Sequence, residues 1–308
     1  MTKLLIDCDP GIDDALALAL VAGSPSLELA GVTTVGGNVD LALTTANALA
    51  LREFLDLGEV PVVPGSPGAL LRNVIRADRV HGSSGLGDAV LPPATRPAGD
   101  GHAVDFIVET LRAAPGEITL VAIGPLTNIA LAVRKEPRVV EWARDFVIMG
   151  GSYTRGNTNP AAEFNILADP EAAAIVFDAG WTVTMLGLDV TLTALVTTDV
   201  LDRVRPLGRL AELLVVPAAT AYGMVTADGG PAIHDACAIA YVLDPSLFTC
   251  VPAVVQVETA GRYTSGMTVT DFKVGDRRSN ALVATSLDVK RFWDVVLDAY
   301  AGLAARLG

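Results

Sequence analysis

The sequence predicts a single-domain α/β fold of the Rossmann-like type, with a mainly parallel central sheet, helices on both faces and a C-terminal antiparallel extension. Strand-like and helix-like segments alternate through the first two thirds of the 308 residues, which is typical of parallel sheets. The last third contains strand-like runs joined through glycines instead. With 51% hydrophobic residues, the chain can bury a large core, which argues against disorder.

The strands of the parallel part are predicted from short apolar runs that end at glycine, proline or a polar residue. These strands are expected at residues 4–7, 29–35, 60–63, 118–123, 146–149 and 182–186. Helical spacing of apolar residues follows most of them. The helices are expected at residues 12–22, 41–57, from just after 125 to about 133, and 169–179.

The C-terminal third has a different pattern. Residues 254–257 and 267–269, connected through Gly261 and Gly266, predict an antiparallel hairpin. A strand near 281–285 and a helix from about 288 to 307 complete the chain. Because no repeat of 20–50 residues and no linker is visible, residues 1–308 are expected to form one domain.

Charge and composition exclude several classes of function. Lys and Arg number 22 and Asp and Glu 35, so the net charge of −13 argues against nucleic acid as a partner. No apolar run is long enough for a membrane span, so no membrane partner is expected. The start of the chain does not resemble a signal peptide, and three cysteines suggest reduced thiols. A cytoplasmic protein with a neutral small substrate and a bound cation fits these features.

Four aspartates lie around one predicted strand-to-helix turn, namely Asp7, Asp9, Asp13 and Asp14. Carboxylates this close repel one another unless a counter-charge is present. A hard divalent cation such as Ca²⁺ or Mg²⁺ takes oxygen ligands and supplies that charge. The structural alternative is that Asp13 and Asp14 stabilise the first helical turn while Asp9 caps a turn.

The predicted topology indicates where a ligand binds. In open α/β sheets, ligands bind beyond the carboxyl ends of the strands. The residues that follow the predicted strands include Asp9, Asn38, the backbone at residues 123–124, and residues 150–152. We therefore expect polar side chains and small residues to converge on one crevice.

Asp7 and residues 9–14 (DPGIDD) resemble the DxDPGxDD signature of the nucleoside hydrolases, which are calcium-dependent N-ribohydrolases. Other segments resemble blocks of that family in the same order. They are residues 81–87 (HGSSGLG), the turn at 123–128, residues 157–165 (with AEFN at the end), and residues 234–236 (HDA). The resemblance spans residues 4–236, and the C-terminal third matches only in general character.

The resemblance implies hydrolysis of the N-glycosidic bond of ribonucleosides, preferring inosine or uridine, in purine or pyrimidine salvage. It assigns Ca²⁺ to Asp9, Asp14, Asp235 and the main-chain carbonyl of Ile123. Such hydrolysis needs an activated water, an oxocarbenium-like ribose and a departing base. Asp9 is expected to accept the proton of the attacking water.

The ribose contacts are expected from acids and amides. A neutral sugar offers hydroxyls that both donate and accept, and amide and carboxylate side chains satisfy them without positive charge. By resemblance these contacts come from Asp13, Asn38, Asn157, Glu163 and Asn165. The alternative for residues 157–165 is an ordinary loop, because asparagine and proline are common turn residues.

The histidines and one tyrosine have roles toward the base. His234 is expected to be the general acid for the leaving base, since imidazole titrates near neutrality. His81 either assists or lines the pocket, and Tyr222 either contacts the base or belongs to the core. The alternatives are a helix cap at Asp235 and a surface loop at His81. His102 matches no block and is expected to be structural.

The residues alone leave two other classes of function open. A Mg²⁺-dependent phosphohydrolase of the haloacid dehalogenase type also has aspartates at a strand end. Here, however, the turn carries Pro10-Gly11 rather than a DxT nucleophile pattern. A non-catalytic nucleoside- or sugar-binding protein has little need for converging carboxylates. The expected partner is a small-molecule nucleoside, and the resemblance implies a homodimer or homotetramer.

Overall fold

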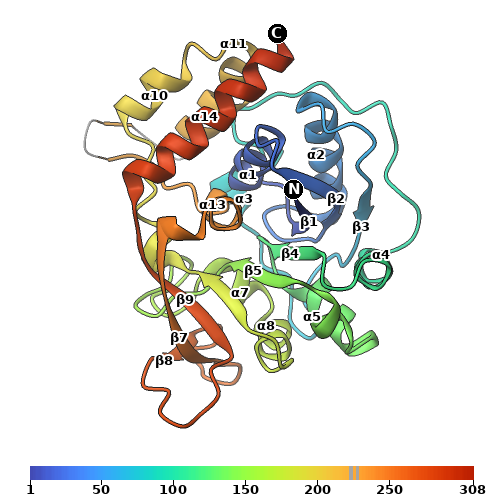
Figure 1. Ribbon diagram of the computed structural model, residues 1–308, viewed down its shortest axis with the longest axis vertical. Coiled ribbons are helices and arrows are strands. Elements are labelled where there is room, and N and C mark those ends of the chain that lie inside the picture. Colours follow the sequence, from blue (N-terminus) through green and yellow to red (C-terminus); the bar gives the residue numbers. More distant parts are fainter. Residues whose placement is uncertain (222–224, 227–228) are drawn as a thin grey trace.

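The computed structural model describes residues 1–221, 225–226 and 229–308. Its strands form one mixed sheet in the order β3-β2-β1-β4-β5-β6-β9-β7-β8 (Figure 1). In chain order the strands are β1 (Thr2–Cys8), β2 (Leu27–Thr34), β3 (Val62–Pro64), β4 (Ile118–Ala122), β5 (Asp145–Met149), β6 (Val183–Leu186), β7 (Phe248–Val257), β8 (Thr268–Asp271) and β9 (Ala281–Leu287).

The sheet is mostly parallel, as predicted. Each pairing from β3 through β6 to β9 is parallel, whereas β7 runs antiparallel to both β9 and β8. The predicted hairpin is present, with Val257 opposite Thr268. Strand β7 begins earlier than predicted because its first half pairs with β9, where Phe248 faces Leu287. That pairing joins the antiparallel extension to the parallel sheet.

The strand order contains one switch point, between β1 and β4. From β1 the chain builds outward through β2 and β3, and from β4 it builds in the opposite direction through β5 and β6. Beyond the carboxyl ends of two such strands the flanking connections diverge and leave a crevice. Asp9 follows β1 and Ile123 follows β4, so both lie at this crevice.

Helices cover both faces of the sheet (Figure 1). Helices α1, α2, α13 and α14 pack on one face, and α4, α5 and α8 pack on the other. The helices are α1 (Ile12–Ala22), α2 (Leu41–Phe54), α3 (Asp78–His81), α4 (Ala103–Ala113), α5 (Thr127–Lys135), α6 (Val139–Trp142), α7 (Phe164–Ala168), α8 (Pro170–Phe177), α9 (Leu188–Thr191), α10 (Thr198–Val204), α11 (Gly208–Leu210), η1 (Ala211–Val215), α12 (Val216–Ala221), α13 (Ala236–Leu243), η2 (Pro245–Leu247) and α14 (Val289–Leu307).

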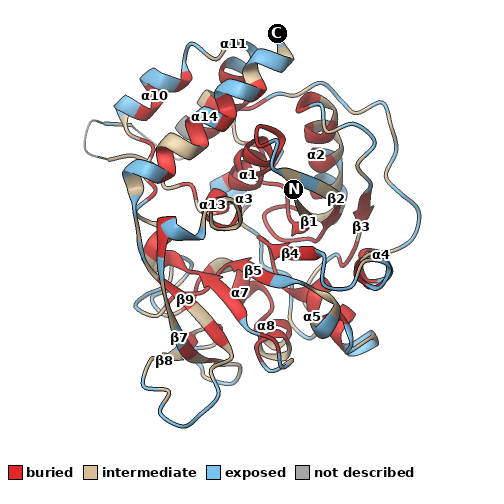
Figure 2. Cartoon of the chain, in the orientation of Figure 1, coloured by how far each residue is buried: buried red, intermediate tan, exposed pale blue. Residues whose placement is uncertain are grey.

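Helix α1 is buried along its whole length, and Figure 2 shows it within the molecule. A helix that is apolar on all sides belongs inside a domain. Helix α14 packs against it, and the Tyr300 hydroxyl donates to the carbonyl of Leu16 at 2.9 Å. The burial of α1 also draws Asp13 and Asp14, at its first turn, out of solvent.

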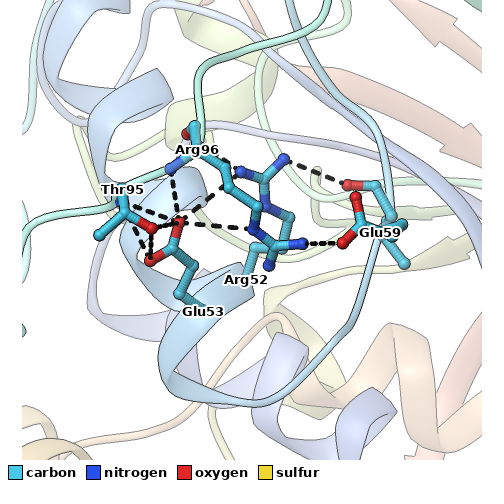
Figure 3. A network of polar contacts seen from close by, with 6 residues as sticks. Arg52, Glu53, Glu59, Thr95 and Arg96 are labelled. Atoms are coloured by element: carbon cyan, nitrogen blue, oxygen red, sulfur yellow. Dashed lines mark hydrogen bonds and ion pairs between the residues drawn. The ribbon is translucent and has the colours of Figure 1, made fainter.

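The long connection after α3 is fixed against the end of α2 (Figure 3). The Glu53 carboxylate accepts the main-chain N–H groups of Thr95 and Arg96 at 2.9 and 2.8 Å. The Arg96 guanidinium pairs with Glu59 at 2.6 Å, and Arg52 donates to the Arg96 carbonyl at 3.0 Å. These contacts tie the segment that follows residues 81–87 to the rest of the fold.

Two expectations from the composition concern membrane spans and cysteines. In the described part of the chain, no helix combines the length and the apolar character that crossing a membrane requires. Cys8, Cys237 and Cys250 are unpaired thiols, as the sequence analysis expected.

Candidate functional site

A cavity of about 550 Å³ lies at the carboxyl ends of the central strands. Nine of the residues singled out from the sequence line it: Asp13, Asn38, His81, Ile123, Asn157, Glu163, Asn165, His234 and Asp235. Asp9 and Asp14 are buried next to this wall and bond to Asn38. The structure therefore brings together segments that are as far apart in sequence as residues 9 and 235.

The two oxygens of Asp9 have different surroundings. Oδ2 accepts the main-chain N–H of Asn38 at 2.7 Å, whereas the buried Oδ1 has no hydrogen-bond partner. The chain packs tightly around this carboxylate. A Cβ on Gly37 would lie 2.1 Å from Oδ2, and one on Gly124 would lie 2.6 Å from Oδ1. Only glycine at both positions leaves room for the carboxylate in this orientation.

Asp14 closes the turn between β1 and α1. One oxygen accepts the N–H of Asp9 at 3.1 Å, and the other accepts the N–H of Gly11 at 2.9 Å and Nδ2 of Asn38 at 3.1 Å. The structural alternative, an acid in the first helical turn, thus describes these contacts of Asp14. Asp13 differs, because its Oδ2 accepts the main-chain N–H of His234 at 3.1 Å and so connects α1 to the segment before α13.

Asp235 does not act as a helix cap. It immediately precedes α13, but its side chain makes no capping hydrogen bond, and it is only 4% exposed. Burial raises its pKa well above the usual value, and the neighbouring charges of Asp14, Asp13 and Asp9 raise it further. The capping alternative for this residue is therefore wrong.

The buried carboxylates at the site repel one another. Burial raises the pKa of Asp9 well above its ordinary value, the charge of Asp14 adds to this, and the Asn38 N–H opposes it. Burial also raises the pKa of Asp14 to about 7, although the hydrogen bond from the Gly11 N–H lowers it in part. Buried carboxylate oxygens of this kind are the ligands that a hard divalent cation takes. Among the described residues, no three acidic, histidine or cysteine side chains already stand in a ligating arrangement.

The carbonyl of Ile123 is held by Asn165. Nδ2 of Asn165 donates to the carbonyls of Ile123 and Met149 at 3.0 and 3.1 Å, which links the ends of β4 and β5. Glu163 caps α7, because its carboxylate accepts N–H groups of the first turn and that of Gly151 at 3.0 Å. Burial raises the pKa of Glu163, and these N–H groups oppose the shift. The two side chains organise the cavity wall while they line it.

Asn157 also combines a loop contact with a place in the wall. Its Oδ1 accepts the main-chain N–H of Phe164 at 3.0 Å. The loop alternative for residues 157–165 is thus correct for the local hydrogen bonds, and the same residues line the cavity. The sequence pattern alone did not reveal that these two descriptions are compatible.

His81 is buried at the end of α3, so the surface-loop alternative is wrong. Its Nδ1 accepts the main-chain N–H of Ile12 at 3.1 Å, so the ring proton of the neutral form lies on Nε2. Burial lowers the pKa of His81, Asp13 opposes this, and His234 lowers it further. The ring is therefore neutral near pH 7.

His234 is held from two directions. Its main-chain N–H donates to Asp13, and its Nδ1 lies 2.8 Å from the hydroxyl of Thr191. Burial lowers the pKa of His234 against the opposing charge of Asp13. Thr191 could not be recognised from the sequence, because a threonine in a short apolar segment carries no distinctive signal.

Asp7 and His102 do not line the cavity. Asp7 lies in the sheet beneath the site, where its Oδ1 accepts Nδ2 of Asn128 at 2.8 Å and its buried Oδ2 has no hydrogen-bond partner. His102 is structural, as expected, because Nδ1 accepts the N–H of Val104 and caps α4. Tyr222 lies outside the described residues.

Some cavity residues had no sequence signal at all. Arg76, Arg79 and Val80 line it from the segment around α3, and Leu192 and Pro231 line it from the side of His234. They belong to no recognisable pattern, and only the folded arrangement brings them to the cavity.

Comparisons with known proteins agree on one family. The sequence model described as inosine-uridine preferring nucleoside hydrolase matches residues 4–294. A relative of that name from Leishmania major is 43% identical over 303 residues, which is 96% of each chain. A relative from Escherichia coli O1:K1, named pyrimidine-specific ribonucleoside hydrolase RihB, is 40% identical over 306 residues, 97% of each chain.

Solved structures are similar over nearly the whole fold. A purine-preferring ribonucleoside hydrolase from Gardnerella vaginalis superposes with a TM-score of 0.91 at 35% identity, covering 98% of this chain and 99% of that one. An inosine-guanosine nucleoside hydrolase gives a TM-score of 0.88 at 31% identity, covering 97% of this chain and 98% of that one.

Proposed function

The chain belongs to the inosine-uridine preferring nucleoside hydrolase family and is an N-ribohydrolase, and we propose that it cleaves ribonucleosides to free base and ribose with Ca²⁺ as its metal. The observation that carries the calcium part is the buried, unpartnered Oδ1 of Asp9 among other buried carboxylates. Membership in this family argues against the phosphohydrolase and non-catalytic interpretations.

The ligands assigned to the ion are Asp9, Asp14, Asp235 and the carbonyl of Ile123. All four supply oxygen, which suits Ca²⁺. When bound, such an ion acidifies a water molecule and fixes sugar hydroxyls. Both oxygens of Asp14 accept main-chain N–H groups in this structure. On this proposal, the Asp14 carboxylate therefore has to shift when the ion binds.

Asp9 accepts the proton of the attacking water. The buried Oδ1 without a hydrogen-bond partner supports this role, because a base needs a free lone pair directed at the proton it accepts. Asp13, Asn38, Asn157, Glu163 and Asn165 orient the ribose, and their shared place along one cavity supports this assignment. Holding the sugar in the reactive geometry lowers the barrier by roughly several kcal/mol, as positioning of reactants usually does.

His234 donates a proton to the leaving base, and His81 assists. Both rings line the cavity, and although burial lowers the pKa of each, the charge of Asp13 opposes this shift and favours the protonated form that an acid needs. The neutral His81 carries its proton on Nε2, so it can donate a hydrogen bond from that atom.

The first experiment is base release. Purified protein is incubated with inosine, uridine, cytidine and adenosine, with and without a calcium chelator, and the products are separated by chromatography. Both purine and pyrimidine nucleosides are needed because the relatives' names include both preferences. Free base and ribose that disappear on chelation and return with Ca²⁺, but not with Mg²⁺, support the proposal. Release that survives chelation contradicts the metal assignment, and intact nucleosides throughout contradict the substrate assignment.

The proposal extends to a cytoplasmic homodimer or homotetramer that acts in nucleoside salvage. Its support is the family resemblance and the high sequence coverage of the relatives. Light scattering after size-exclusion chromatography gives the mass of the assembly, and a monomer of 31.9 kDa contradicts this part.

A further inference from the structure

A buried hydroxyl lies against the ring of His234. Thr191 ends α9, is fully buried, and places Oγ1 at 2.8 Å from His234 Nδ1. The other residues of α9 that surround it are mainly apolar, such as Leu188 and Val190. Within the part of the chain that the structure describes, the Thr191 hydroxyl is hydrogen-bonded to His234, which lines the cavity.

The backbone holds these two residues in register. The segment before His234 pairs with the segment after Thr191: the Ile233 N–H donates to Ala194 at 3.0 Å, and the Val196 N–H donates to Pro231 at 2.8 Å. An isolated antiparallel bridge joins Leu195 and Ala232 between them. The contact between the hydroxyl and the ring is therefore fixed by main-chain pairing rather than by a chance rotamer.

We propose that Thr191 is a positioning residue that fixes the imidazole of His234 so that Nε2 faces the leaving base. An imidazole turns readily about χ2, which is a broad torsion, and a bond at Nδ1 selects one of its two orientations. A hydroxyl both donates and accepts, so the bond is kept whichever ring nitrogen carries the proton. The inference rests on the proposed role of His234 and extends it to a residue outside the cavity wall.

The test compares two kinds of substrate. Thr191→Val removes the hydroxyl at nearly constant volume, and Thr191→Ser keeps it. Turnover is measured on inosine and uridine, which need a proton on the leaving base, and on 4-nitrophenyl riboside, whose leaving group needs none. Thr193→Val is the matched control, because the Thr193 hydroxyl donates to the Val190 carbonyl at 2.6 Å in the same segment.

Thr191→Val should lower kcat on the nucleosides by roughly tenfold or more, since general acids contribute about 10²- to 10⁴-fold. KM for nucleosides and turnover of the nitrophenyl riboside should stay near the original values, and Thr191→Ser should restore most of the loss. Thr193→Val should leave both substrates unaffected. Equal losses on both substrates, or no loss on nucleosides, overturn the inference.

A comparison with His234→Ala separates this inference from the function it rests on. In one outcome, His234→Ala loses activity on nucleosides only, while Thr191→Val affects both substrates equally. That pair of results keeps the acid role of His234 and contradicts the positioning role of Thr191. Equal losses in His234→Ala remove the acid role and the inference with it. Thr191→Ala is the second hydroxyl-free variant, and melting temperatures show which variants are folded.

Discussion

The main-chain N–H of Asn38 donates to Oδ2 of Asp9 at 2.7 Å, while Oδ1 of the same buried carboxylate has no hydrogen-bond partner. A buried carboxylate oxygen without a partner is costly unless a ligand completes it. The contact therefore sets the direction in which Oδ1 points. It also requires the chain to fold back so that residues 37–38 lie beside the end of β1.

Asp9→Ala should abolish turnover and weaken calcium binding together. The carboxylate has two proposed roles, as proton acceptor and as ligand, and loss of the acid–base part alone costs about 10²- to 10⁴-fold. Turnover on inosine and uridine and calorimetric titration with Ca²⁺ measure the two roles. Asp298→Ala, an exposed site on α14, is the control. Unchanged calcium affinity in a folded Asp9→Ala protein would contradict the ligand role.

Gly37→Ala should strongly reduce both stability and activity. The added Cβ would lie 2.1 Å from Asp9 Oδ2, so the carboxylate or the backbone has to move. Gly302→Ala is the matched control, because Gly302 is exposed on α14 and its Cβ would meet nothing closer than 3.8 Å. That change should stabilise the chain by about 0.5–1 kcal/mol through helix propensity. Urea unfolding measures both, and equal effects would show that crowding at Asp9 is unimportant.

The sequence predicted much of this fold because its signals are local. Residues 4–6 are all apolar and are followed by a turn and a helical pattern, and the structure has β1 and α1 there. The length of β7 was not predictable, because half of it forms by pairing with β9, which is distant in sequence. Propensity cannot show which partner a strand will find.

The candidate site divides in the same way. Asp9, Asn38 and Ile123 follow strands, so topology alone indicated them before any resemblance was considered. Thr191 and Arg76 had no such signal, since a cavity wall is defined by tertiary contacts. The local alternatives for Asp14 and for the loop at Asn157 also describe the hydrogen bonds of these residues, because one side chain can hold a turn and lie at or beside a cavity wall at the same time.

The stability of the metal-free protein should fall as pH rises from about 4 to about 7. Burial raises the pKa of Asp7 to about 7, although hydrogen bonds from Thr33 and Asn128 lower it in part. An unfolded aspartate has a pKa of about 3.9. The folded form therefore holds a proton that the unfolded form has lost. This favourable contribution is complete below the unfolded pKa and is lost as pH rises through the folded pKa.

Asp7→Asn should flatten this dependence by about 1.4 kcal/mol per pH unit within that window. The amide keeps the shape of the side chain and does not titrate. Urea unfolding in chelator at about pH 4.5 and about pH 6.5 gives the slope for each protein. The exposed Asp298→Asn change should leave the slope as it is. A slope that Asp7→Asn does not alter would show that this carboxyl is not the source.

Calcium should raise the free energy of unfolding, and Asp235→Asn should reduce that gain. A ligand that binds only the folded state at about 100 times its Kd stabilises by about 2.7 kcal/mol. Asp235 is buried among like charges that raise its pKa, so in the absence of Ca²⁺ the neutral amide should cost little or even stabilise. Thermal melts with and without Ca²⁺ distinguish the two effects. An equal calcium shift in both proteins would remove Asp235 from the proposed ligand set.

Asn165→Asp should destabilise the chain and impair turnover more than Asn165→Ala. Nδ2 of Asn165 donates to the carbonyls of Ile123 and Met149, so a carboxylate in its place sets a charged oxygen against two acceptors. Each buried group left unsatisfied costs about 1–3 kcal/mol, and alanine avoids the added repulsion. Urea unfolding gives the order of stability.

The same pair tests what the Ile123 carbonyl does. Because Asn165 holds that carbonyl in place, both variants should weaken calcium binding in addition to raising KM for nucleosides. Asn157→Ala is the control, because Asn157 lines the same cavity and its side-chain oxygen accepts hydrogen bonds from Thr158 and Phe164. It should raise KM while leaving calcium affinity near its original value. If Asn157→Ala weakens calcium binding as much as Asn165→Ala does, the carbonyl of Ile123 is not what links Asn165 to the ion.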